Sequence, residues 1–170
     1  MPETVTFFVP GNPVPKGSMT AYYNKHLRQA VLVQNNEDKV KAWEKTIRSL
    51  AWQAWAPRDP TSGPVHAGLV FWFDRPAKHY RTGKYSNVLR DDAPVEVFLK
   101  KWDGDKLQRP VFDAMTGIIY DDDGRVSKLL GVEKLWSNDH RPGVEIRVIA
   151  QEIRYANDRL QPSLGRAGAF

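Results

Sequence analysis

Two tight groups of aspartates are the residues of this chain best suited to chemistry. Asp103 and Asp105 are separated by a single glycine, and the run 121–123 begins sixteen residues after Asp105. The stretch between the groups is short and helix-like, so folding could bring them together. Two carboxylates about 4 Å apart repel by about 4 kcal/mol at an effective dielectric of about 20, so convergence would require a cation. Mg²⁺ or Mn²⁺, hard ions that prefer oxygen ligands, are the natural candidates.

The composition favours one globular domain with a polyanionic partner. The chain has 170 residues, is 41% hydrophobic, and carries a net charge of +5 with a pI near 9.5. That size fits a single core, and the basic charge favours nucleic acid as a partner, although many basic proteins have no such partner. Acidic metal ligands in a basic chain indicate an enzyme that grips a polyanion and hydrolyses it.

Several other kinds of site are excluded. The chain contains no cysteine, which rules out disulfides, thiol nucleophiles and cysteine-ligated zinc, and its four histidines form no zinc-type pair. No export signal and no apolar run long enough to span a membrane are present. A calcium loop of the EF-hand type fails, because aligning Gly124 places Ile119 and Leu130 where carboxylates are required.

The hydrophobic pattern predicts one α+β domain over residues 1–158, with a small mixed sheet packed against two main helices. A strong helix is expected from about Glu37 to Ala54, with Asn36 as its N-cap, because apolar residues recur at three- and four-residue spacing. Residues 159–170 resemble a loose tail. Strands are expected at Thr4–Val9, Ala30–Val33 and Val65–Phe73, followed by a closing pair, Val126–Trp136 and Gly143–Ile153, joined by a loop.

The acidic groups are expected at the two ends of a second helix, over about Lys106–Thr116. The residues before it are expected to be extended, in which case Asp103 and Asp105 would point to the same side. Pro110 should kink this helix or confine its regular part to the later turns. Arg109, four residues after Asp105, would share a helix side with it and could neutralise transition-state charge. The alternative for Arg109 is a local ion pair with Asp105 or Asp113.

A basic insertion over about residues 75–100 separates the strand Val65–Phe73 from the first acidic group. Its interleaved cations and tyrosines fit phosphate contact with base stacking, and fit a mobile, solvated loop equally well. The candidate contacts to a DNA backbone are four cations, namely Lys16, Lys106, Arg81 and Lys84.

By composition alone, the acidic groups could be no more than a solvated turn and a helix N-terminus. Metal-assisted phosphodiester hydrolysis is the best chemical alternative, because carboxylates can hold Mg²⁺ to activate water and stabilise charge. Two further functions stay open: a non-catalytic protein that binds branched DNA, and a metal-dependent nuclease of flaps and replication forks.

Three segments together resemble the RusA-type Holliday junction resolvases. They are 101–109 (KWDGDKLQR), 112–117 (FDAMTG) and 120–126 (YDDDGRV). The family signature opens with Asp-x-Asp-[Asn/Lys]-Leu-x-Lys, continues with Asp-Ala-Leu and closes with Asp-Asp-x-Gln-Val. The N-terminal segment 6–17 (TFFVPGNPVPKG) is also similar to the family. Arg109 stands at the family's lysine position, and Arg125 stands where glutamine is common.

The resemblance implies a Mg²⁺-dependent endonuclease, with Mn²⁺ as a possible substitute, that cuts four-way DNA junctions as a homodimer. Asp103, Asp105 and Asp123 would hold the metal, with Asp122 the neighbour most easily confused with Asp123. A C₂ dimer is also favoured on physical grounds, because a four-way junction has approximate two-fold symmetry and needs two matched cuts. The resemblance further implies that the protein acts in the cytoplasm of a bacterial host. A phage or prophage gene is a possible source.

Overall fold

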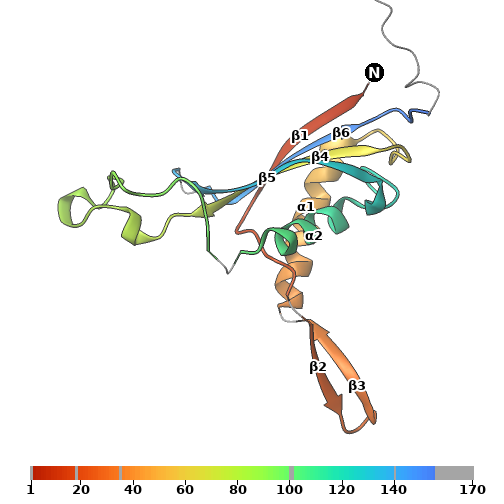
Figure 1. The fold of residues 1–170 in the computed structure, drawn as a ribbon, viewed down its shortest axis with the longest axis horizontal. Helices are drawn as coiled ribbons and strands as arrows, with labels where there is room; N and C mark the ends of the chain where they lie inside the picture. The colour runs from red at the N-terminus through yellow and green to blue at the C-terminus, as the bar shows by residue number, and fades with distance from the viewer. Residues whose placement is uncertain (1, 18, 35, 100–101, 140, 156–170) are drawn as a thin grey trace, which may run out of the picture.

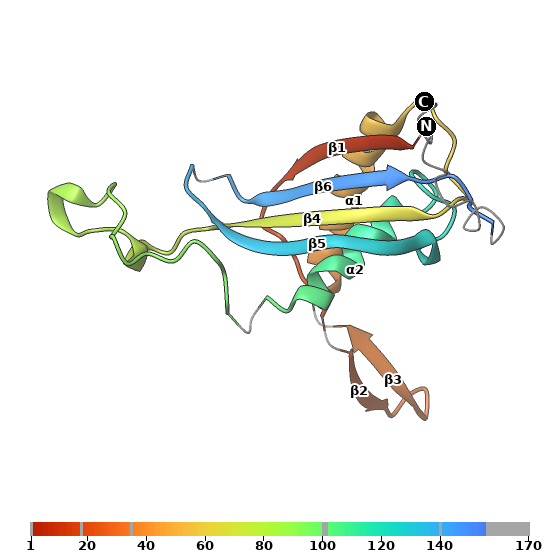
Figure 2. The same ribbon diagram turned by 45° about the horizontal axis from the view of Figure 1, so that its top comes forward.

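The protein is an α+β domain built as two layers, a four-stranded mixed sheet with two helices on one face (Figures 1 and 2). This computed structural model describes residues 2–17, 19–34, 36–99, 102–139 and 141–155. The expected fold class is confirmed, whereas the predicted tail over 159–170 lies outside the described residues. Within the described ranges, none of the helices is long and apolar enough to cross a bilayer.

The central sheet contains four strands in the order β1-β6-β4-β5. β4 pairs with β6 in antiparallel fashion and with β5 in parallel. In β4, the alternation of the sequence matches the alternation of burial, because every second side chain from Val65 to Phe73 lies in the core. The four strands are β1 (Glu3–Pro10), β4 (Val65–Asp74), β5 (Val126–Ser137) and β6 (Gly143–Ala150).

The prediction that the last two strands form a closing pair is wrong. β5 and β6 follow one another along the chain, but β4 lies between them and hydrogen-bonds to both. β4 carries the most continuous apolar segment, VHAGLVFWF, and that segment is best buried at the centre of the sheet. β5 consequently becomes an edge strand.

The first helix, α1 (Glu37–Trp55), covers the β1 side of the sheet. Its buried stripe is the one that the spacing predicts, with Val40, Trp43 and Ile47 packed into the core. Asn36 occupies the N-cap position but does not cap with its side chain. Its amide nitrogen instead donates to the Pro15 carbonyl over 3.1 Å, which ties the N-terminal segment to the start of the helix.

The second helix, α2 (Gly104–Met115), packs against α1 and lies beside β5 (Figure 2). It starts two residues earlier than predicted, so Asp103 is its N-cap and Asp105 lies in its first turn. The expectation of an extended chain through Asp105 is therefore wrong. The helix also runs through Pro110, which is buried in its interior.

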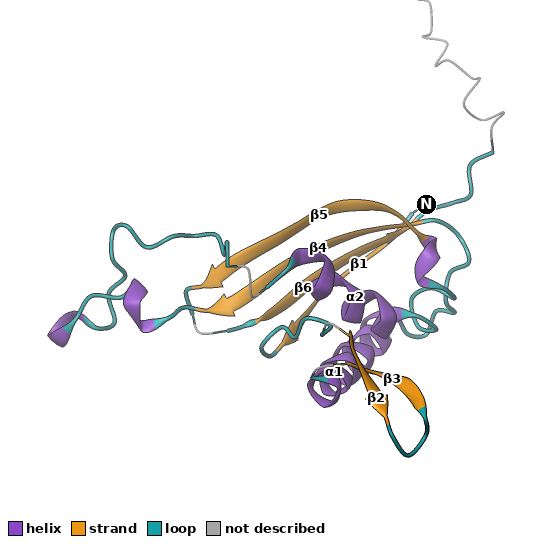
Figure 3. Ribbon diagram, turned by 60° about the horizontal axis from the view of Figure 1, so that its bottom comes forward, coloured by secondary structure: helices purple, strands orange, loops and turns teal. Residues whose placement is uncertain are grey.

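Two segments project from this core. A hairpin of β2 (Met19–Asn24) and β3 (Gln29–Gln34) extends beyond α1 and forms a sheet of its own (Figure 3). Residues 75–99 form an arm that extends from the far end of β4 (Figure 1). The arm contains two short 3₁₀ helices, η1 (Ala77–His79) and η2 (Gly83–Tyr85).

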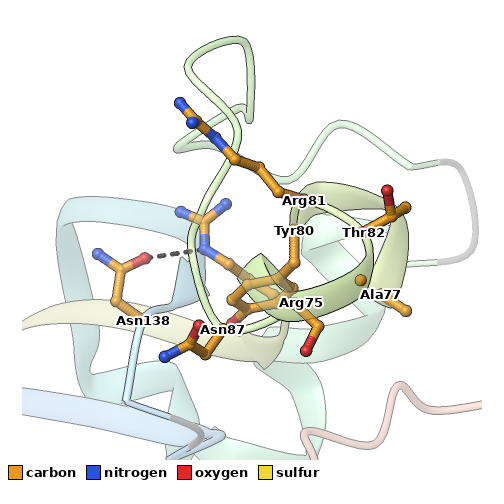
Figure 4. A pocket seen from close by; sticks show the side chains of 9 residues that line it. Arg75, Ala77, Tyr80, Arg81, Thr82, Asn87 and Asn138 are labelled. Atoms are coloured by element: carbon orange, nitrogen blue, oxygen red, sulfur yellow. Dashed lines mark hydrogen bonds between the residues drawn. The ribbon is translucent and has the colours of Figure 1, made fainter.

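The arm is a folded unit anchored by a buried arginine. The Arg75 guanidinium donates to the Asn138 side chain over 2.8 Å and to the Pro94 carbonyl over 2.7 Å (Figure 4). The buried His79 ring meets Trp136 edge-on at 5.0 Å between ring centroids. These contacts join both legs of the arm to the end of the sheet. Arg75 and Asn138 also line a pocket of about 660 Å³.

Candidate active site

Asp103 lies at the start of α2, and its carboxylate has no hydrogen bond or ion pair among the described residues. Its backbone carbonyl accepts the amide of Leu107, but its side chain makes no capping hydrogen bond. It lines an open pocket of about 440 Å³. A carboxylate that is not used to stabilise the helix remains available as an oxygen ligand.

Asp105 is held by Arg109 one turn further along the helix. The two side chains form an ion pair at 2.8 Å, and both are more than half exposed. Exposed i,i+4 pairs stabilise a helix by on the order of a few tenths of a kcal/mol, so this contact opens at little cost. The spacing therefore placed Arg109 correctly on the same helix side as Asp105.

Lys134 is a candidate that sequence reasoning missed. It lies in β5 between Val132 and Trp136, at a position whose register partner is the buried Phe71. Its ammonium donates to the Trp102 carbonyl over 2.9 Å and lines the same pocket as Asp103. A lysine at a core-facing position of a strand is the signal that could have found it.

The three aspartates of the run 121–123 have three different environments. Asp121 accepts two hydrogen bonds from Arg125, at 2.7 and 2.9 Å, and this guanidinium lowers the pKa of Asp121. Asp122 caps the short helix η3 (Asp123–Arg125) by accepting the Gly124 amide over 2.8 Å. Among the described contacts, the Asp123 carboxylate has neither a hydrogen bond nor an ion pair. It is thus the member of the run whose oxygens are available.

Tyr120 fixes the position of this run against α2. Its buried hydroxyl donates to the Phe112 carbonyl over 3.0 Å. Burial, followed by the negative charges of Asp123 and Asp113, raises the pKa of Tyr120 far above its ordinary value. The phenol therefore stays neutral and keeps its proton in this hydrogen bond.

Lys16 bridges two turns of α2. Its backbone amide donates to the Lys106 carbonyl over 2.8 Å, and its ammonium meets the Asp113 carboxylate at 2.6 Å. The first bond explains how Pro110 is tolerated. Proline has no amide proton to offer the carbonyl four residues earlier, which is that of Lys106, and Lys16 supplies a donor instead.

The family comparison agrees with this arrangement. A family model described as "Endodeoxyribonuclease RusA" matches residues 10–149, which include both acidic groups, Arg109 and the Lys16 turn. The chain belongs to the RusA endodeoxyribonuclease family. No protein with a curated description matches it significantly.

The carboxylates of Asp103, Asp105 and Asp123 are oxygen ligands of the kind that a hard divalent cation prefers. Within one chain, however, they do not converge on a common point. Among the described residues, no group of three acidic or histidine side chains is arranged to hold a metal ion. Asp103 and Asp105 lie at the N-terminal end of α2, whereas Asp123 opens η3 after the C-terminal end of that helix (α2 is labelled in Figure 1). The expectation that all three share a pocket is not met inside a single subunit of this RusA protein.

The predicted DNA-contacting cations of this RusA protein fall into two groups. Lys106 lies in the first turn of α2 next to Asp105, and Lys16 bonds to its carbonyl from outside the helix. Arg81 and Lys84 lie on the arm, where Arg81 pairs with the exposed Asp91 at 3.1 Å and Lys84 lies over the Tyr85 ring at 5.0 Å.

The β2–β3 hairpin adds a third basic group that the sequence did not single out. Its exposed turn carries Lys25, His26 and Arg28. The hydrophobic pattern indicated only possible short strands there, so the cations at their turn had no recognisable context.

Proposed function

We propose that this RusA family member is a divalent-metal-dependent, structure-selective endonuclease that resolves four-way DNA junctions by paired nicks. The proposal rests on which carboxylates at the motif positions already have hydrogen-bond or ion-pair partners and which do not. Among the contacts of the described residues, Asp103 and Asp123 are unengaged and Asp105 is held by an exposed ion pair, while the neighbouring Asp121 and Asp122 are used to build η3.

In this proposal Asp103, Asp105 and Asp123 hold Mg²⁺, with Mn²⁺ as a substitute. The ion, when bound, would activate water and stabilise negative charge on the phosphate. Arg109 swings from Asp105 to the scissile phosphate, where its planar fork can donate two parallel hydrogen bonds. Lys134, anchored at the Trp102 carbonyl, adds positive charge beside Asp103. Asp122 has a structural role, because it caps η3 and so positions Asp123.

The two basic projections and the Lys16 turn are proposed to hold the DNA backbone. Lys106 and Lys16 lie beside the acidic residues, and the arm and the hairpin extend in other directions from the core (Figure 3). Phosphate contacts of this kind give affinity without sequence preference. They fit a substrate that is recognised by its branching rather than its sequence.

We also propose that the functional molecule is a homodimer. Two matched cuts in a junction with approximate two-fold symmetry require two sites related by the same symmetry. We further propose that residues 1–158 act as one catalytic domain, and that the protein works in the cytoplasm of a bacterial host on phage or host DNA.

The direct test compares cleavage of synthetic four-way junctions by the wild-type protein and Asp105→Asn, with and without Mg²⁺. The wild type should nick two strands symmetrically only with the metal, and Asp105→Asn should bind without nicking. Asp38→Asn is the matched control, because Asp38 is also an exposed carboxylate in the first turn of a helix. Binding without wild-type nicking would favour a non-catalytic branch-binding protein, and preferred cleavage of flaps or forks would favour the other nuclease class.

A further inference from the structure

A pocket in the arm takes no part in the chemistry proposed for the acidic residues. Its volume of about 660 Å³ lies within the range of about 300–1,000 Å³ that is usual for ligand sites. The acidic residues of the candidate active site are not among those that line it. Its lining consists mainly of hydrogen-bonding side chains, among them Arg75, Tyr80, Arg81, Ser86, Asn87 and Asn138 (Figure 4).

The pocket is shaped by pairing between the two legs of the arm. The Arg81 amide donates to the Val88 carbonyl over 2.9 Å, and the adjacent Tyr80 and Leu89 form an antiparallel bridge. The tip of the arm, which contains η2, therefore folds back on itself before any ligand binds. A preformed pocket loses less conformational entropy on binding than a loop that must first become ordered.

Arg75 provides a fixed cation inside this pocket. Its side chain is 7% exposed, and its guanidinium is held by the Asn138 side chain and the Pro94 carbonyl. These contacts use Nε and Nη1, and the described residues provide no hydrogen bond to the remaining nitrogen, Nη2. Of the described residues that line the pocket, none is acidic. A buried donor of this kind favours a ligand that brings a hydrogen-bond acceptor.

The other lining groups match the two parts of a nucleotide. Arg81 and the hydroxyl groups of Thr82 and Ser86 are exposed at the tip of the arm and can donate to phosphate oxygens. The Asn87 amide offers a donor and an acceptor side by side, as does the hydrogen-bonding edge of a nucleobase. The half-buried ring of Tyr80 adds an aromatic surface, on which a base of any kind can stack.

Regular duplex DNA cannot occupy this pocket. Its bases are stacked in the interior, and its phosphates need surface cations rather than a cavity. A single nucleotide that has left the stack can enter, with its base in the cavity and its phosphate at the rim. Leaving the stack costs least for a nucleotide that is already unpaired. Branch points can supply such nucleotides, whereas an uninterrupted duplex does not.

We propose that the arm pocket binds one unpaired nucleotide of the DNA substrate. Arg75 and Asn87 bond to the edge of the base and Tyr80 stacks on it, while Arg81 contacts its phosphate. The pocket thereby distinguishes branched from regular DNA without reading its sequence, because an amide can pair with the edge of any of the four bases. This inference rests on the proposed DNA-binding function and specifies the feature of the substrate that the arm recognises.

The first experiment measures binding without a metal ion, and hence without cleavage. Its three labelled probes are a fully paired duplex, the same duplex with one extra unpaired nucleotide, and that second duplex with the base of the extra nucleotide removed. By fluorescence anisotropy, the wild type should bind the second probe about ten-fold more tightly than either of the others, within the range that base stacking contributes. Equal binding of the second and third probes would show that only the backbone is recognised, and would overturn the proposal.

Two variants test the pocket without changing the charge of the protein. Asn87→Ala removes the partner for the base edge, and Ser86→Leu fills the cavity at a position with ordinary helical backbone angles. Each should reduce the ten-fold preference to about two-fold or less, with an unchanged melting temperature and unchanged affinity for the paired duplex. Gln53→Ala, which removes an exposed amide from α1, is the matched control and should keep the full preference. Full preference in both pocket variants would place the nucleotide elsewhere on the protein.

The outcomes separate this inference from the proposed nuclease function. If the wild type cuts junctions but binds the three probes alike, the pocket proposal fails and the nuclease function stands. If the preference for the unpaired base is present but no junction is cut with Mg²⁺, the nuclease function fails and the pocket stands. Displacement of the probe by free dAMP at lower concentrations than by the unlabelled second duplex would assign the pocket to a soluble nucleotide, and would overturn the proposal.

Discussion

At the scale of single residues, the arrangement separates aspartates that build the loop from those that are available for chemistry. Asp121 and Asp122 fix η3, whereas Asp123 has its carboxylate free among the described contacts. Because asparagine caps helices as well as aspartate does, Asp122→Asn should keep both stability and nicking. Asp123→Asn should lower nicking by on the order of 100-fold or more with an unchanged melting temperature, as expected for loss of a group that stabilises the transition state. Initial rates on a labelled junction and thermal melts of both variants measure the difference.

Arg109 gives a second prediction, in which activity and stability change separately. Arg109→Lys keeps the positive charge that the family has at this position, so nicking should fall only a few-fold. Arg109→Ala should lower it by on the order of 100-fold. Neither substitution should change the free energy of unfolding by more than about 0.5 kcal/mol, because the pair with Asp105 is exposed. Equal nicking by both variants would show that the role of Arg109 is limited to its ion pair with Asp105 within α2.

At the scale of elements, the Lys16 turn and α2 depend on each other through Pro110. In Pro110→Ala the new amide can donate to the Lys106 carbonyl, which Lys16 uses in the native protein. Exchange of the Lys16 amide with deuterium should become several-fold faster while α2 itself becomes better protected. Hydrogen exchange read by NMR measures both amides. Unchanged protection of Lys16 would mean that the carbonyl accepts both donors and that Pro110 has no part in holding the turn.

The arm should loosen in mild acid because of His79. Burial first, and then the positive charge of Arg75, lowers the pKa of His79 below its ordinary value. The folded arm thus binds fewer protons than the open arm, so its stability is full above about pH 6.5 and declines as the pH falls towards the lowered pKa. Protease cleavage within 75–99 should speed up between pH 7.5 and 5.5. His79→Gln should reduce that pH dependence and His66→Gln, at the other end of β4, should leave it unchanged.

Local patterns in the sequence predicted most elements but not how they are combined. The apolar spacing of Val40, Trp43 and Ile47 specifies α1, and the alternation from Val65 specifies β4. The insertion of β4 between β5 and β6 could not be read, because strand pairing depends on partners distant in the chain. The accommodation of Pro110 was equally hidden, since its compensating donor comes from Lys16, some ninety residues earlier.

At the scale of the whole molecule, the main departure from expectation is the distance between the acidic groups. The motif spacing predicts Asp103, Asp105 and Asp123 as the metal ligands, but it carries no information on whether a helix between them separates or joins them. In the structure, α2 lies between the pair Asp103 and Asp105 and the later Asp123, and it holds the two acidic groups apart. In the proposed homodimer, two subunits related by a two-fold axis would match the two cuts that a four-way junction requires.

The chain carries a net charge of +5, and several of its cations lie on the arm and on the β2–β3 hairpin. These charges predict how salt affects DNA binding. Each phosphate contact that is lost should reduce the slope of log K against log salt by about 0.9. The double variant Arg81→Gln/Lys84→Gln should therefore lower the slope by about two and weaken binding to junctions of any sequence alike. The ion pair between Arg81 and Asp91 does not prevent Arg81 from contacting a phosphate, because both side chains are exposed and the pair opens readily.

The matched control for this prediction is Lys39→Gln/Lys45→Gln, which removes the same charge from the exposed face of α1. It should change the slope little, because long-range effects of exposed charges are screened beyond about 10 Å at 0.1 M salt. Fluorescence anisotropy with a labelled junction over a range of salt concentrations measures both slopes. Equal reductions in the two variants would mean that DNA senses only the total charge of the protein, and would remove the arm from the binding surface.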